Sequence, residues 1–579
     1  MLLALLAAAA LAAQPAPPAD APLIANRDLR SLADDYDKAS MEARGLIPGP
    51  AQESVAGAAL PRVDRATQER RAAERRRMLA RLTAIPAAQL TESDRVNAAV
   101  LRTVLEAEIA DARFREWEMP VNSDTNFWTY LDRRERLPDA DAYRRYIARM
   151  RDVPRFFAEQ IANLEAGLKR GFTPPAVTLA GRDASLAPFL RPPADNPFFA
   201  AFRSMPPTIP AEEQAKLREE GEAAIREAVI PAYARLLAFW RERYVPGARK
   251  TLAARDLPDG DAYYRSEVRE YTTLDLPPEE IHQIGLREVA RLSAEMRATM
   301  KETGFTGDFA AFLAHIRSDP RFIARTPDDL LGVSAYAAKR VDGKLDDYFA
   351  VLPRRRYTII PVPEALAPFY TAGRGGLDSC QMNTHDLPSR PLVNIPALTL
   401  HECAPGHSFQ AALAAEGQAL PRFRRSLYFS GYGEGWGLYS EWLGIEMGIY
   451  RTPYERFGQQ SYEMWRAARL VIDTGIHLYD WSRGRAIDYL ASHTALSAHE
   501  VETEIDRYIS WPSQALSYQL GLIEMKRLRR QAEQELGPDF DIKAYHSMIL
   551  ALGSVPLAEL QTQVDQFVAA AKKKPAPSR

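Results

Sequence analysis

The segment HECAPGH, residues 401–407, combines the residue types of a zinc hydrolase in an unusual spacing. In the H-E-x-x-H signature, two histidines on one helical face bind the metal and the glutamate between them acts on water. His401 and His407 lie six residues apart, so a regular helix would turn them about 120° away from each other. Pro405 and Gly406 disfavour a regular helix, because proline lacks an amide hydrogen and clashes with the preceding turn. A bulge or break would allow the histidines to meet, but the spacing alone does not require it.

A second segment, GYGEGWGLYSEWLGIEMG at residues 431–448, offers a third ligand. Glu434 and Glu441 are seven residues apart and therefore share one face of a helix. A zinc hydrolase needs three protein ligands and one open position, and Glu434 suits the third ligand. Glu441 is then a partner of a ligand histidine or an alternative ligand. Two solvated carboxylates would also fit, although the neighbouring Gly, Trp and Tyr residues favour a buried helix, where unpaired carboxylates are costly.

Most of the chain is predicted to be helical. Apolar residues recur at spacings of three and four in segments rich in Ala, Leu, Glu and Arg, and prolines mark the start of the last segment. These segments are 64–118, 138–169, 211–245 and 276–300. The stretch 171–210 contains nine prolines and predicts a long surface loop. Strands are predicted at 356–362 and at 389–398, which runs directly into HECAPGH.

These patterns predict a mainly α fold, a large helical zincin-like body with a small β-sheet beside the metal-binding helix. The edge of such a sheet can pair with an extended peptide, although two buried strands with no ligand role fit equally well. We divide the chain into an N-terminal helical region, residues 24–350, and a C-terminal metallopeptidase-like core, residues 351–579.

Composition sets limits on the function. The chain has 579 residues, 46% hydrophobic and 26% charged, as in soluble globular proteins. The net charge of −2 gives no electrostatic basis for binding nucleic acid or an anionic membrane surface. Cys380 and Cys403 are too few for a disulfide scaffold, and the sequence does not decide whether they pair. The oligomeric state also stays open.

The N-terminus predicts export. Its Leu and Ala run is shorter than the roughly 20 residues that span a bilayer. We interpret residues 1–13 as a signal peptide, with the small residues Ala10, Ala12 and Ala13 near the cleavage point. The protein is therefore expected in the periplasm or outside the cell. No cysteine follows the run as an acceptor for a lipid anchor, and no later stretch suits stable membrane insertion.

Five blocks in order carry a family resemblance: LTLHECAPGHSFQ, YGEGWGLYSEWLG, RLVIDTGIHLYDWSRGRAIDYL, EIDRYISWPSQALSYQLG and FDIKAYHSMILALGSVPLAEL. The C-terminal part of the chain resembles the bacterial family called domain of unknown function 885, gluzincin-like predicted zinc metallopeptidases with many exported members. The resemblance implies that His401, His407 and Glu434 bind zinc and that Glu402 is the general base. Ser408 departs from the bulkier residues usual in the family, and the Cys403 thiol could ligate a metal or oxidise.

The remaining blocks offer further site residues. His477, Arg507, Tyr508 and Tyr518 are candidates to stabilise the oxyanion, and we favour His477 and Tyr518 as catalytic residues. Arg469 and Gln514 could bind a substrate carboxylate, with Arg507 and Tyr508 as further substrate-binding residues. For each of these residues alone, a role in the core fits as well.

The expected function is a zinc-dependent peptidase that hydrolyses short peptides through a metal-activated water. The alternative is an exported helical protein that binds a peptide or another ligand without catalysis. A thiol hydrolase based on Cys403 lacks a nucleophile context.

Overall fold

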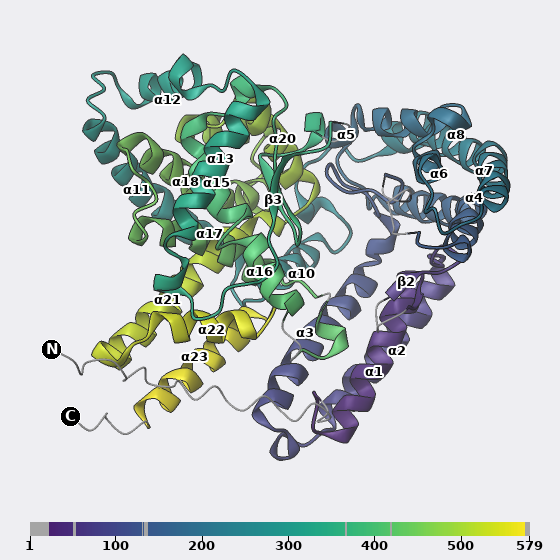
Figure 1. Cartoon of the computed structure of the whole chain (residues 1–579), viewed down its shortest axis with the longest axis horizontal. Coiled ribbons are helices and arrows are strands. Elements are labelled where there is room, and N and C mark those ends of the chain that lie inside the picture. Colours follow the sequence, from purple (N-terminus) through teal and green to yellow (C-terminus); the bar gives the residue numbers. More distant parts are fainter. Residues whose placement is uncertain are drawn as a thin grey trace.

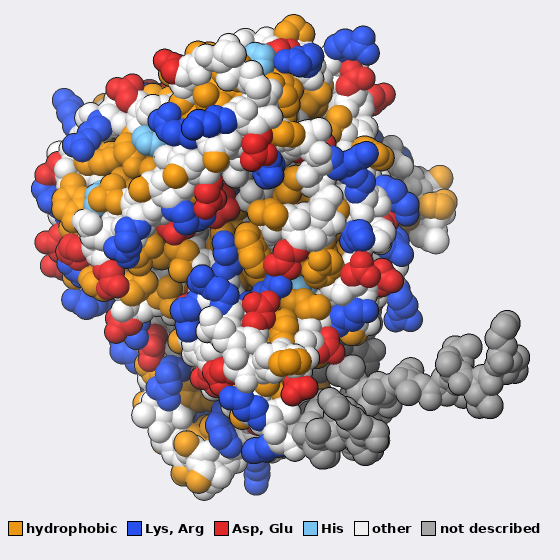
Figure 2. All heavy atoms as spheres, turned by 90° about the vertical axis from the view of Figure 1, so that its left-hand side faces the viewer, with side chains coloured by type: hydrophobic (Ala, Val, Ile, Leu, Met, Phe, Trp, Pro, Cys, Tyr) orange, Lys and Arg blue, Asp and Glu red, His pale blue; other side chains and the backbone are white. Residues whose placement is uncertain are grey.

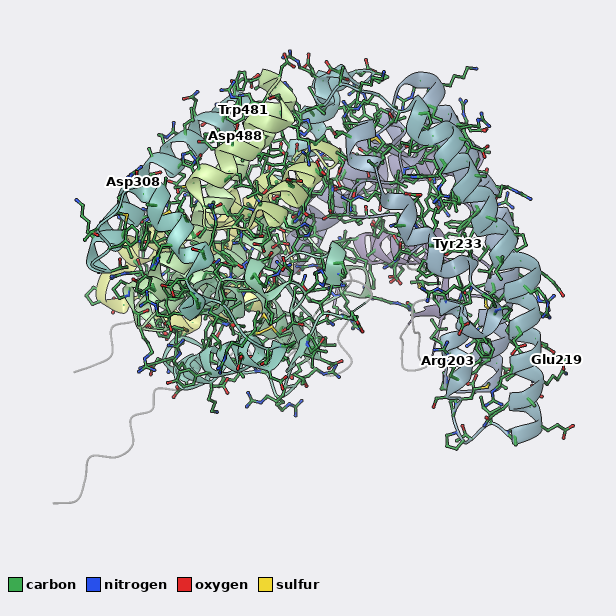
Figure 3. All side chains as sticks on the ribbon, turned by 90° about the horizontal axis from the view of Figure 1, so that it is seen from above. Arg203, Glu219, Tyr233, Asp308, Trp481 and Asp488 are labelled. Carbon is green, nitrogen blue, oxygen red and sulfur yellow. A yellow bond between two sulfur atoms is a disulfide. The ribbon has the colours of Figure 1, made fainter. Side chains whose placement is uncertain are left out.

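The structure is a computed structural model that describes residues 23–49, 54–129, 131, 137–364, 367–416, 420–425 and 427–573. The predicted signal peptide lies outside this part of the chain. The fold is mainly helical, which confirms the prediction. In Figure 1 the C-terminal helices form a broad body, and the N-terminal helices lie along its side. Seen from above, Arg203, Glu219 and Tyr233 lie on this side arm and Asp308 on the far side of the body (Figure 3).

The first half of the chain forms long helices joined by short ones. The helices are α1 (Arg27–Ala43), α2 (Arg65–Thr83), α3 (Glu92–Phe114), α4 (Ala140–Arg170), α5 (Ala176–Leu179), α6 (Ala200–Arg203), α7 (Ala211–Ala224), α8 (Ile230–Phe239), α9 (Val245–Gly247), α10 (Gly260–Thr272), α11 (Pro278–Glu302), α12 (Phe309–Ser318), α13 (Pro327–Asp342) and α14 (Leu345–Tyr348). The proline-rich stretch 171–210 is not the predicted loop. It forms short helical turns because Phe189, Phe198 and Phe202 are buried against α4 and α8.

The second half contains the helices that hold the candidate site. They are α15 (Ile395–Glu402), α16 (His407–Glu416), α17 (Ser430–Glu446), α18 (Pro453–Tyr479), α19 (Arg483–His493), α20 (Ala498–Ser510), α21 (Ser517–Leu536), α22 (Ile542–Ala551) and α23 (Leu557–Lys572). Helix α18 lies in the centre, and every residue from Ser461 to His477 on it is buried. It packs along α11, and α17 packs along α21.

The described residues contain two small sheets. A hairpin pairs β1 (Leu46–Pro48) with β2 (Ser54–Ala56). The other sheet has the order β3-β5-β4, with β3 (Thr358–Pro361) parallel and β4 (Gly373–Gly375) antiparallel to β5 (Ser379–Met382). Strand β3 confirms the strand predicted at 356–362. Strand β4 lies at the edge and contacts α15, so the small sheet lies beside the HECAPGH segment as expected.

The strand predicted at 389–398 is wrong. Residues 392–394 form a helical turn, and α15 begins at Ile395 with Pro396 in its first turn, where a missing amide hydrogen costs nothing. Residues 395–401 are all buried, so α15 has no polar face. A short apolar run of this kind has the same periodicity in a buried strand and in a buried helix, which explains the error.

Hydrophobic side chains on both sides of residue 350 share one core. Leu29 and Leu101 from the N-terminal helices belong to the same cluster as Leu443 and Leu528. The division of the chain at residue 350 therefore stays a prediction. None of the helices in the described ranges is long and apolar enough to cross a bilayer. Figure 2 shows one face on which acidic and basic side chains are intermixed.

Candidate metal centre

The HECAPGH segment is a tight turn between two helices. Helix α15 ends at Glu402, the Ala404–Pro405 peptide is cis, and α16 begins at His407. The Gly406 amide donates to the Leu400 carbonyl at 3.0 Å, and a Cβ on Gly406 would lie 1.9 Å from the carbonyl oxygen of His401. Only glycine allows the chain to fold back so closely. The two imidazole ring centres end 4.8 Å apart, so the break brings together histidines that a regular helix would separate.

Helix α17 adds a carboxylate to this pair. Oε2 of Glu434 lies 3.4 Å from Nε2 of His401 and 3.3 Å from Nε2 of His407. These distances exceed those of good hydrogen bonds. They match the separation of about 3.4 Å that two donors have when both bind one tetrahedral metal at ~2.1 Å. One donor atom from each of the three residues lies within 4.8 Å of the others, so the donor set fits a metal ion.

Glu441 orients the first histidine. Its buried Oε1 lies 2.8 Å from Nδ1 of His401, and Nη2 of Arg466 lies 3.6 Å from the same oxygen. An imidazole that donates from Nδ1 keeps the lone pair of Nε2 free for a metal. Glu441 is thus a hydrogen-bond partner of His401, and Glu434 offers the third donor atom of the cluster.

The charges of the cluster are strongly coupled. Burial lowers the pKa of His401, but contacts with Glu434 and Glu441 outweigh it and raise that pKa to about 9. Burial also raises the pKa of the Glu434 carboxyl, but the two histidines hold it well below its usual range. Glu434 is therefore an anion at neutral pH, and a cation bound here would replace the proton on His401.

Glu402 faces the same space from the end of α15. Its Oε2 accepts from the Gly375 amide of the edge strand β4 at 2.5 Å. A disulfide joins Cys380 on β5 to Cys403, directly after Glu402. The thiol of Cys403 is therefore not free, and the bond ties the turn to the central strand of the sheet.

Tyr428 is a site residue that the sequence analysis missed. Its hydroxyl donates to Oε1 of Glu434 at 2.9 Å, and its side chain lines the same cavity as the donors. It precedes α17 in a segment without a motif, so no sequence signal marked it.

Comparisons with known proteins agree with the five sequence blocks. The family model described as "Bacterial protein of unknown function (DUF885)" matches residues 50–564. The chain belongs to this family. A search of curated proteins returned no match. A crystal structure of a candidate lipoprotein from Colwellia psychrerythraea is 26% identical, with a TM-score of 0.86 over 94% of this chain and 99% of that one. A candidate lipoprotein of unknown function from Shewanella oneidensis, 17% identical with a TM-score of 0.67 over the same shares, has a similar fold.

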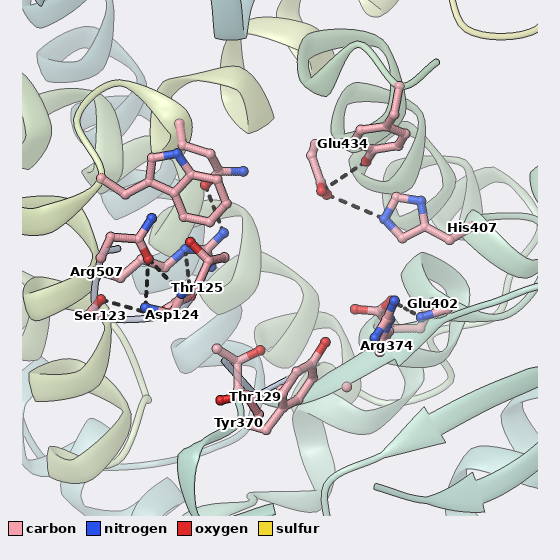
Figure 4. A pocket seen from close by; sticks show the side chains of 18 of the residues that line it. Ser123, Asp124, Thr125, Thr129, Tyr370, Arg374, Glu402, His407, Glu434 and Arg507 are labelled. Carbon is pink, nitrogen blue, oxygen red and sulfur yellow. Dashed lines mark hydrogen bonds and ion pairs between the residues drawn. The ribbon is translucent and has the colours of Figure 1, made fainter. Parts of the chain in front are cut away.

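In this DUF885 chain the three residues that offer metal-donor atoms line a cavity of about 1150 Å³. Of the predicted substrate-binding residues, Arg469, Arg507 and Gln514 line it, as does Tyr518. Figure 4 shows His407, Glu434 and Glu402 on one side and Arg507 with Ser123 and Asp124 on the other. Residues 122–129 of the N-terminal half also contribute to the cavity wall, although no motif predicted this. The Ser123 amide in this segment donates to the hydroxyl of Ser510 on α20 at 3.0 Å.

His477 and Tyr508 do not line the DUF885 cavity as the structure describes it. Nδ1 of His477 accepts from the Ala254 amide at 2.9 Å, and Nε2 donates to the Tyr508 carbonyl at 2.8 Å. Burial lowers the pKa of His477 to about 3, so the ring is neutral. Both ring nitrogens are occupied in the core, which argues against the predicted oxyanion role. The Tyr508 hydroxyl instead accepts from Arg469 at 2.9 Å and supports that side chain.

Proposed function

We propose that this protein is a zinc-dependent, gluzincin-like peptidase that hydrolyses short peptides. One observation carries the proposal: His401, His407 and Glu434 converge from three helices at separations suited to one shared metal ion. Two imidazoles and one carboxylate form a ligand set of catalytic zinc sites, which leave one position open. A zinc ion held there would supply the Lewis acidity that activates water and a carbonyl group. The zincin-like character of the helical body belongs to this proposal.

The residues around the donors suit the other steps of hydrolysis. Glu402 would take a proton from the attacking water, and the Gly375 amide fixes its carboxylate at the cavity wall. The Tyr428 hydroxyl, which donates to Glu434, would turn from this carboxylate and donate to the oxygen of the carbonyl as that oxygen gains charge. Tyr518, which the sequence suggested for this role, lies on another part of the wall, beside Arg469 and Arg507.

The edge strand gives the site a way to hold a peptide. Gly373, Arg374 and Gly375 of β4 line the cavity, and an extended peptide could pair with this edge. Both halves of the chain contribute to the walls, so the cavity favours short, flexible peptides over folded proteins. The disulfide suits an oxidising compartment, and two structurally similar proteins are described as candidate lipoproteins. We therefore propose that the protein works outside the cytoplasm.

The test is hydrolysis of a short-peptide library by zinc-loaded protein, compared with Glu402→Gln. We expect turnover in the wild type and a loss of at least about 100-fold in the variant, with unchanged zinc content. Glu280→Gln, at an exposed position of α11, is the matched control and should behave as the wild type. Peptide binding without turnover by the zinc-loaded wild type would instead support a non-catalytic binding protein.

A further inference from the structure

The cavity wall is rich in positive charge. Among the described residues that line it there are seven arginines, no lysine and three carboxylates. Two of these carboxylates, Glu402 and Glu434, belong to the candidate catalytic site. The third, Asp124, lies 3.4 Å from Nε of Arg507 and is thereby paired. A cavity of this kind attracts anions, and its described lining leaves no carboxylate to hold the ammonium group at the N-terminus of a peptide.

Two arginines of the cavity wall, Arg469 and Arg507, are held in fixed positions. Arg507 donates to Oε1 of Gln514 at 2.7 Å and to the Tyr518 hydroxyl at 3.3 Å. Arg469, with only 1% of its surface exposed, has its guanidinium 4.2 Å from the Tyr518 ring centre and 4.4 Å from that of Trp465. Packing and hydrogen bonds therefore preorganise two guanidinium groups at one place in the wall.

This group has unused hydrogen-bond donors. Glu504 pairs with Arg469 at 2.6 Å, yet Nη1 of Arg469 is buried and has no partner in the part of the chain that the structure describes. The Tyr518 hydroxyl accepts from Arg507, which leaves its own O–H to donate. Buried donors without acceptors are costly, and arginine pairs favourably with carboxylates. The missing partner is an anionic group with more than one acceptor oxygen.

We propose that Arg469, Arg507 and Tyr518 bind the free C-terminal carboxylate of the substrate, so that the enzyme removes residues from the C-terminal end of short peptides. This inference rests on the proposed function and adds its substrate class. Arg507 of this group lies across the cavity from His407 and Glu434 (Figure 4), so a peptide anchored by its carboxylate extends toward the candidate metal ligands. The span between the two groups then sets how many residues are released.

Binding to metal-free protein tests the carboxylate site, because a free carboxylate could otherwise bind the metal itself. The probes are N-acetyl-tetraalanine, its C-terminal amide, and an amidated peptide that ends in glutamate, titrated by calorimetry after removal of metal. We expect the amide to bind about 10- to 100-fold more weakly than the acid, since charge-assisted hydrogen bonds are lost. Equal binding of acid and amide overturns the inference. Equal binding of the acid and the glutamate-ending amide assigns the site to acidic side chains and also overturns it.

Variants locate the site. Arg507→Gln should remove most of the preference for the acid, whereas Arg425→Gln, a cavity arginine outside this group, should retain it. Melting temperatures identify a variant that has failed to fold, and Tyr518→Phe then serves in its place. An unchanged preference in folded Arg507→Gln and Tyr518→Phe overturns the assignment.

Hydrolysis by the zinc-loaded protein separates the two proposals. Cleavage of the acid but not of the amide supports both. Equal cleavage of both peptides overturns the C-terminal inference and leaves the peptidase proposal standing. Selective binding of the acid without any cleavage overturns the peptidase proposal and supports the carboxylate site.

Discussion

Gly437 is the position where a single methyl group should disable the metal centre without harming the fold. It lies on α17, three residues after Glu434, and faces the ring of His401. A Cβ at this position would lie 2.6 Å from Cε1 and 2.8 Å from Nε2 of that ring. The His401 ring cannot easily yield, because it is 2% exposed and Glu441 holds its Nδ1 at 2.8 Å.

The size of the effect follows from these distances. A normal carbon–carbon contact is about 3.5 Å, so Gly437→Ala requires a displacement of nearly 1 Å. If the ring moves, it leaves Glu441; if α17 moves, it carries Glu434 away. Metal–ligand distances vary by only about 0.2 Å. We therefore expect zinc affinity to fall at least about 10- to 100-fold, as it does when a metal ligand loses its hydrogen-bond partner. Helix propensity by itself favours alanine by about 1 kcal/mol, so the fold should survive.

Competition with a chelating dye measures the zinc affinity, and circular dichroism measures the melting temperature. Gly332→Ala on α13 is the matched control, since no atom lies within 4 Å of its added methyl group. We expect the control to bind zinc as the wild type does. Wild-type affinity in a folded Gly437→Ala protein would refute the position assigned to His401 in the metal centre.

Four further predictions test other parts of the site. Glu441→Gln should weaken zinc binding about 10- to 100-fold, and unchanged affinity would contradict its orienting role. Tyr428→Phe should lower kcat about 100-fold at constant zinc content, and an unchanged kcat would assign the oxyanion contact elsewhere. Replacing Cys380 and Cys403 by alanine should lower the free energy of unfolding by about 3 kcal/mol, as expected for a disulfide that closes a loop of 23 residues. It should also weaken zinc binding, and an unaltered zinc affinity would show that the disulfide does not support the site. The pKa of His477 is about 3 in the folded protein and 6.5 ordinarily, so on acidification below pH 6.5 this imidazole takes up a proton in the unfolded chain but not in the folded one. Stability should then fall by about 3 kcal/mol from pH 6.5 to pH 4 in urea unfolding. In His477→Gln the fall in stability between pH 6.5 and pH 4 should be smaller, and activity should persist. A fall as large as that of the wild type would contradict a buried, neutral His477 ring.

The sequence predicted the parts of the site that depend on residue type and order. The helical content and strand β3 were predictable from periodicity and local composition, whereas β4 and β5, which complete the sheet beside HECAPGH, were not. The convergence of His401 and His407 was not, because it depends on how Gly406 packs against the preceding carbonyl. The spacing only excluded a regular helix and left the direction of the break open.

Other features depended on tertiary packing that no local pattern records. Buried α15 has no polar face, so its sequence also suited a strand. His477 was a reasonable catalytic candidate by type, but its partners, Ala254 and Tyr508, come from distant segments and hold it in the core. The contribution of residues 122–129 to the cavity likewise arises only when the N-terminal half packs on the C-terminal half.

The most direct test of the proposed metal centre is the metal content of purified protein, measured by elemental mass spectrometry on the wild type and on His407→Ala. We expect about one zinc per chain in the wild type and a loss of zinc in the variant at equal folded content. The wild type is purified without chelators and then dialysed against zinc. If it still contains no zinc, the result contradicts the metal centre and the role assigned to Glu402. Zinc retained at one per chain in His407→Ala would place the ion elsewhere.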